Sequence, residues 1–111
     1  MDIAFRTRKL EKTFNSAEVL QKAYGVRMAK AIMIRLAVLK AARTLALVPT
    51  TPPDRRHQLR GDRDEPFAVD LVHPHRLVFE ANHDPLPRKD DGGIDVEQVS
   101  AITIIDVIDY H

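Results

Sequence analysis

The sequence contains no cysteine. This excludes a disulfide-stabilised scaffold and a zinc site built on thiolates, and it fits a reducing cytoplasm. Long uninterrupted apolar runs are also absent. The most apolar stretch, residues 26–48, carries five basic residues, which excludes an ordinary membrane span. No apolar run of signal-peptide length follows Met1, and no internal repeat or low-complexity tract is visible. We therefore expect a small, soluble, cytoplasmic domain with no membrane partner.

The charges of the chain are distributed unevenly. Its 111 residues suit one domain with a single hydrophobic core. Residues 1–63 hold 14 Lys and Arg against 5 Asp and Glu, a formal charge of +9, whereas residues 64–111 hold 3 against 11, a charge of −8. A basic half can attract nucleic acid or an acidic protein, and equally the two halves can neutralise each other after folding. Composition alone leaves both interpretations open.

Hydrophobic periodicity predicts a strand, then helices, then three strands. Short apolar–polar alternations are typical of strands, whereas apolar residues three and four apart are typical of helices. The expected helices cover residues 8–14, 16–20 and 26–48, the last ended by Pro49, Pro52 and Pro53. The expected strands cover residues 2–6, 67–71, 76–80 and 99–108, the last apolar on both faces as in a central strand. This order predicts an α+β domain, a small antiparallel (mixed) sheet with the N-terminal helices packed on one face.

An acidic loop is predicted at about residues 82–98, between the last two strands. Its first part contains two prolines, a Gly-Gly pair and five charged residues, so we expect it to be exposed. Loops this long are usually functional or mobile.

A basic cluster lies between the prolines and the strand expected at residue 67. Residues 55–63 contain four arginines together with His57. Guanidinium groups match phosphate oxygens in bidentate geometry, and histidine can move protons near neutral pH. The cluster therefore suits phosphate chemistry, although a solvated basic loop would have the same composition.

A second candidate group closes the sequence. Asp109, Tyr110 and His111 follow an apolar strand, and each can donate, accept or orient a proton. The alternative is that Tyr110 packs and His111 is merely exposed. His73 and His75 are two residues apart, but the intervening Pro74 is more typical of a turn, so we predict no metal site and no cofactor.

The sequence resembles the RelE/ParE superfamily of bacterial toxin–antitoxin modules, nearest its HigB branch, known as plasmid maintenance system killer. The resemblance covers nearly the whole chain as one domain, residues 1–111. It depends on residues 57–63, on the strand pair at residues 67–71 and 76–80, and on the final Asp-Tyr-His. It implies a RelE-like β-α-α-β-β-β order and a ribosome-dependent endoribonuclease that cleaves mRNA and inhibits translation. It further implies metal-free chemistry, in which the 2′-hydroxyl of the RNA attacks the adjacent phosphate.

The resemblance also implies roles for individual residues. His57 and His111 match catalytic histidines, Asp109 matches an acidic partner, and Tyr110 matches an aromatic group that places the nucleotide. Which histidine is the base and which the acid stays open. The residues expected to bind RNA phosphate are Arg56, Arg60, Arg63 and Arg76.

The implied partners are the ribosome with its mRNA and rRNA, and a helix-turn-helix antitoxin of the HigA type. Operator DNA is contacted only through the antitoxin. Two departures from the family pattern suggest an attenuated nuclease: the acidic segment is an insertion, and Arg60 stands where relatives often carry lysine. One alternative is a gyrase-inhibiting toxin of the ParE type. Another is an inactivated toxin that acts only as a binding or corepressor module.

Overall fold

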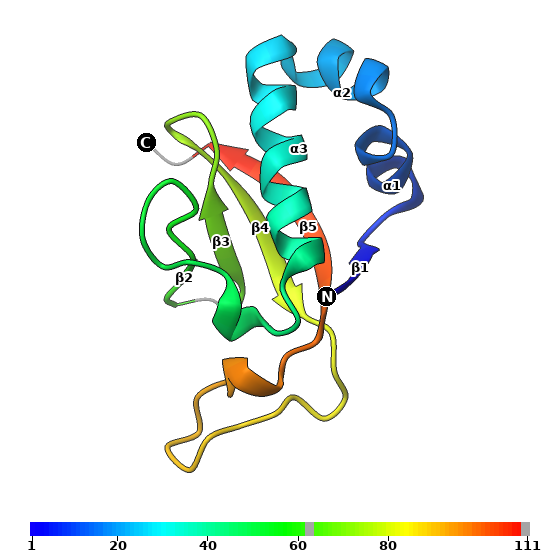
Figure 1. Cartoon of the computed structure of the whole chain (residues 1–111). Coiled ribbons are helices and arrows are strands. Elements are labelled where there is room, and N and C mark those ends of the chain that lie inside the picture. The colour runs from blue at the N-terminus through cyan, green and yellow to red at the C-terminus, as the bar shows by residue number, and fades with distance from the viewer. Residues whose placement is uncertain (62–63, 110–111) are drawn as a thin grey trace.

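The computed structural model describes residues 1–61 and 64–109 (Figure 1). The helices are α1 (Arg8–Phe14), α2 (Ala17–Tyr24), α3 (Val26–Ala41) and two short 3-10 helices, η1 (Leu45–Leu47) and η2 (Val96–Gln98). The strands are β1 (Asp2–Phe5), β2 (His57–Gln58), β3 (Phe67–Asp70), β4 (His75–Ala81) and β5 (Ala101–Asp109). The predicted α+β class is confirmed.

Two of the helices begin at side-chain caps that the sequence supplies. The hydroxyl of Thr7 accepts a hydrogen bond from the backbone N–H of Leu10, and Ser16 does the same for Val19. Each cap satisfies a first-turn N–H that has no partner within its helix. Ser16 therefore starts a helix as predicted, but α2 runs to Tyr24, four residues beyond the expected Leu20.

The prediction of one helix over residues 26–48 is wrong, because α3 ends at Ala41. Ala42 adopts an extended conformation, with φ −69° and ψ 131°, well before the prolines. The amino group of Met1 donates hydrogen bonds to the carbonyls of Leu39 and Ala42, which satisfies acceptors that the end of the helix leaves free. The apolar residues that follow form η1 instead, and the N–H of Leu45 donates to the carbonyl of Val99.

The five strands form one mixed sheet in the order β1-β5-β4-β3-β2. Strand β1 is parallel to β5, and the other neighbours are antiparallel. All four predicted strands are present, and β5 lies inside the sheet as its apolar faces indicated. Strand β2 was not predicted, because two residues cannot show a period. Four strands therefore follow the helices, instead of three.

The hydrophobic core lies between α3 and one face of the sheet (Figure 1). The rings of Phe67 on β3 and Phe79 on β4 are stacked with centroids 6.1 Å apart. Buried side chains of α3 belong to the same core, and the largest of these are Ile32, Leu36 and Leu39. Covering only one face with helices leaves the opposite face of β2, β3 and β4 available for a functional site.

The acidic loop extends from the end of the sheet where β4 finishes and β5 begins (Figure 1). It is folded back on itself: the N–H of Lys89 donates to the carbonyl of Gly93, and Ile94 is 5% exposed. Arg88 forms two hydrogen bonds with Glu65, of 2.7 and 3.1 Å, which join this loop to the segment before β3. The loop is thus attached to the domain at its tip as well as at its ends.

No helix in the described part of the chain is long and apolar enough to cross a membrane.

Candidate functional site

The candidate site occupies the sheet face that the helices leave uncovered. Val69 and Leu77 belong to the core beneath the helices, so the alternating residues Asp70 and Arg76 point to the other face. His57 pairs with Ala68 in the sheet register, which puts its side chain on that same face. The register therefore brings together a histidine, an aspartate and an arginine from three neighbouring strands.

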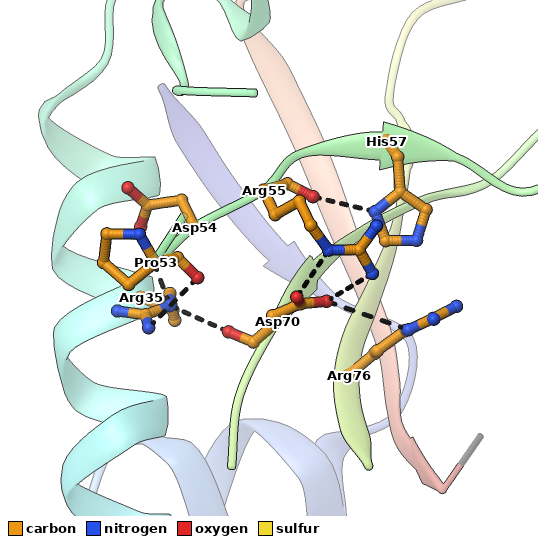
Figure 2. A network of polar contacts seen from close by, with 7 residues as sticks. All are labelled: Arg35, Pro53, Asp54, Arg55, His57, Asp70 and Arg76. Carbon is orange, nitrogen blue, oxygen red and sulfur yellow. Dashed lines mark hydrogen bonds and ion pairs between the residues drawn. The ribbon is translucent and has the colours of Figure 1, made fainter. Parts of the chain in front are cut away.

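An ion-pair network links these strands. The Nε and Nη2 atoms of Arg55 donate to the two carboxylate oxygens of Asp70 at 2.6 and 3.0 Å, and the Nε of Arg76 lies 3.8 Å from the same carboxylate (Figure 2). The hydrogen bond to Asp70 raises the pKa of Arg55. Asp70 thus holds two guanidinium groups side by side on one surface.

Arg55 adopts an unusual backbone conformation. Its φ of 47° is in the left-handed region, which costs a residue with a side chain about 1–2 kcal/mol. This conformation belongs to the turn that sends the side chain of Arg55 to Asp70 and its carbonyl to His57. Such strain persists where the surroundings fix the backbone, and it is concentrated at functional sites.

A second network supports the first from the helix side. Arg35 of α3 donates from Nε to the backbone carbonyl of Asp70 at 2.8 Å and from Nη2 to that of Pro53 at 3.3 Å (Figure 2). Its Nε also lies 3.6 Å from Oδ1 of Asp54, and both side chains are close to fully buried, at 11% and 9% exposure. Arg35 therefore fixes the position of β3 relative to the segment that carries Arg55.

The tautomer of His57 follows from its hydrogen bond. Nδ1 lies 2.8 Å from the backbone carbonyl of Arg55, which can only accept, so the neutral ring carries its proton on Nδ1. The lone pair is then on Nε2, an atom that is buried and has no hydrogen-bond partner in the described part of the chain. His57 and Arg60 line the same depression, of about 600 Å³, between β2 and the segment that follows it.

The other predicted site residues fall in different environments. Arg56 donates from Nε to the carbonyl of Val48 at 3.0 Å, and burial lowers its pKa, so it anchors the segment before β2. Asp109 ends β5 and pairs in register with His75. Arg63, Tyr110 and His111 lie outside the described residues. The structure thus places His57 and Arg60 at one depression, and it places Arg76 beside Asp70, next to the His75 that pairs with Asp109 at the end of β5.

Sequence reasoning missed the roles of Arg35, Asp54 and Asp70. Arg35 and Asp54 carry no local pattern, because their contacts join segments distant in the sequence. The role of Asp70 could have been detected from the sequence. It is a charged residue in an apolar strand. It immediately precedes the turn at residues 71–75, and Arg76 immediately follows that turn. Residues related in this way face each other across a hairpin.

A second depression, of about 610 Å³, lies between α1, α2 and the far part of β5, and contains none of the predicted site residues. It includes Tyr24, whose pKa is raised by burial and by the nearby charge of Asp106. Among the described residues, no group of three or more His, Asp or Glu side chains is arranged to hold a metal ion.

No known protein-family model matches this chain, and comparisons with curated proteins and with solved structures found no match either.

Proposed function

We propose that this chain is the toxin of a type II toxin–antitoxin module and that it cleaves mRNA on the ribosome, as its resemblance to the HigB branch of the RelE/ParE superfamily implies. The observation that carries the proposal is the state of His57. The carbonyl of Arg55 holds the ring in the tautomer whose Nε2 can accept a proton, and the ring lines the same depression as Arg60. A proton acceptor beside a cation suits metal-free phosphodiester cleavage.

The proposed reaction needs a base, a group that stabilises negative charge, and an acid. In the proposal, Nε2 of His57 removes the proton of the 2′-hydroxyl, whose oxygen then attacks the adjacent phosphorus. The bond from phosphorus to the 5′-oxygen breaks, which leaves a 2′,3′-cyclic phosphate and a 5′-hydroxyl. Arg60 stabilises the charge on the phosphorane, and Arg76 binds another phosphate of the RNA. His111 returns the proton to the leaving oxygen, while Tyr110 stacks on the nucleotide and Asp109 orients its neighbours.

Substrate binding must open the surroundings of His57, because its Nε2 is buried in the free protein. Hydrogen bonds at catalytic groups are often made only in the complex with substrate, so this burial is compatible with the role. The proposed partners follow from the same function: ribosomal RNA and mRNA on the basic surface, and a helix-turn-helix antitoxin of the HigA type, all in the cytoplasm. The basic residues of the N-terminal half supply the long-range attraction to RNA.

The test is expression of the chain in a bacterium without its antitoxin, with mapping of RNA 5′ ends on an abundant translated transcript. We expect growth arrest and cleavage within the reading frame, and no cleavage when the transcript is made untranslatable. His57→Gln keeps the size and polarity of the side chain but removes the base. It should abolish cleavage, and His111→Gln should strongly reduce it. His83→Gln, in the acidic loop, is the matched control and should cleave as the wild type does.

Three results would contradict the proposal. Growth arrest with intact transcripts would redirect it to a gyrase-inhibiting toxin of the ParE type. Normal growth with intact transcripts and a soluble protein would favour a binding or corepressor module. Full cleavage by His57→Gln would remove the assigned base and with it the proposed mechanism.

A further inference from the structure

A small cavity lies beside the Arg55–Asp70–Arg76 network, at the end of the sheet where the chain turns from β3 to β4. It has a volume of about 60 Å³. The charged and polar side chains that line it are Arg55, Asp70, His73, His75 and Arg76. It is separate from the depression that His57 and Arg60 line.

The size and charge of this cavity suit one tetrahedral oxyanion. A water-sized group needs about 10–15 Å³ of such volume, so the cavity has room for about four to six of them, and a phosphate group presents four oxygens. Two guanidinium groups against one carboxylate leave a formal charge of +1 around it. Two imidazoles also line the cavity, and Nδ1 of His75 is buried without a hydrogen-bond partner in the described part of the chain.

Asp70 prepares the cations for a ligand and is not itself a ligand for an anion. Its carboxylate takes one N–H from Nε and one from Nη2 of Arg55. A guanidinium carries five N–H groups, so three of those on Arg55 are not used by Asp70. The carboxylate thereby fixes the plane of the Arg55 guanidinium group, but it also repels any anion that binds beside it.

We propose that this cavity binds a phosphate group of the RNA and that Arg55 is a phosphate-binding residue of this protein. The inference rests on the proposed function for the identity of the polymer. Because the cavity is separate from the depression at His57, the phosphate belongs to a nucleotide next to the scissile one. His75 pairs with Asp109 in the sheet register, so the cavity adjoins the end of β5.

The probe is inorganic phosphate, titrated at constant ionic strength into isotope-labelled protein and followed by the backbone amide NMR signals. For the wild type we expect saturable shifts centred on residues 70–76. Arg55→Gln should weaken binding about tenfold, because it removes charge-assisted hydrogen bonds. Asp70→Asn keeps an acceptor for Arg55 but removes the repelling charge, so it should tighten binding about fivefold. Arg27→Gln removes an exposed arginine of α3 and serves as the matched control, with unchanged binding.

Either of two results overturns the inference: no saturable shift at residues 70–76 in the wild type, or an Asp70→Asn variant that binds phosphate no more tightly. Folding of each variant is checked by its thermal unfolding transition. If Arg55→Gln does not fold, Arg55→Lys gives the same test, with a smaller loss of affinity expected. Phosphate binding is measured without RNA cleavage, so the two proposals fail separately. A bound phosphate with intact transcripts contradicts the nuclease, and cleaved transcripts without phosphate binding contradict the cavity.

Discussion

Replacing Arg35 by methionine tests whether the network behind the site stabilises the fold. Methionine keeps the length of the side chain and its helix propensity, so the change removes mainly the charge and the donors. Arg35 donates to the backbone carbonyls of Asp70 and Pro53, and its Nε lies 3.6 Å from the carboxylate of Asp54. Without Arg35, the carboxylate of Asp54, a residue that is 7% exposed, would lose this ion pair.

The expected cost is large relative to the stability of a small domain. Breaking a buried ion pair by removing one partner costs about 3–5 kcal/mol, because the other charge is left unpaired. The whole domain is expected to be stable by about 5–15 kcal/mol. At about 4 °C per kcal/mol for a chain of this size, Arg35→Met should lower Tm by about 15 °C.

Urea unfolding of a double-mutant cycle measures this effect. Asp54→Asn removes the charge that Arg35 compensates, so adding it to Arg35→Met should restore about 2 kcal/mol relative to the single Arg35→Met variant. The free energies of unfolding of all variants and of the wild type are calculated with one common m value, the slope of that free energy against urea concentration. A loss below about 1 kcal/mol for Arg35→Met, or simple additivity of the two changes, would show that the pair does not stabilise the fold.

Three further predictions concern other parts of the molecule. Ser16→Ala should lower the free energy of unfolding by about 1 kcal/mol in urea titrations, because it leaves a first-turn N–H of α2 without its cap. Phe79→Ala should cost about 3–5 kcal/mol in the same assay, since its ring is fully buried. The hydrogen bond from Arg88 lowers the pKa of Glu65 in the folded state, so the pair stabilises the fold above the unfolded pKa of Glu65, and this contribution disappears as the pH falls through the folded value. The difference in unfolding free energy between wild type and Arg88→Gln should therefore be small at neutral pH, because the pair is exposed, and it should disappear as the pH falls below the folded pKa of Glu65; a difference that grows in acid would contradict the assignment.

Local patterns predicted most of the fold. The start of α2 at Ser16 and the alternation in β3 and β4 were readable, because caps and period-two patterns depend on residues close in the sequence. The end of α3 at Ala41 was not readable, because residues 42–48 are as apolar as the helix itself. What ends the helix there is contact with distant segments, including Met1 and Val99.

The candidate site was predicted by residue type more than by arrangement. Arginines and a histidine in residues 55–63 indicated phosphate chemistry, but not that Arg55 and Arg56 have different environments. One forms an ion pair with Asp70 and the other donates to a carbonyl of the chain, and this depends on the backbone turn at Arg55 with its φ of 47°. A positive φ at a residue other than glycine cannot be recognised from the amino-acid composition.

The pairing of β1 with β5 has a consequence for how the chain folds. These strands are the first and last of the described elements, and closing the loop between them has a length-dependent entropic cost of about 4 kcal/mol. On the ribosome, β1 and the three helices emerge well before β5, at about 5–20 residues per second. Until β5 arrives, β1 has no neighbour in the sheet and the face that β4 offers to β5 stays open. We therefore expect the sheet to close only after synthesis of β5, and refolding in vitro to be slow, from about milliseconds to seconds, as for other topologies with distant strand pairs.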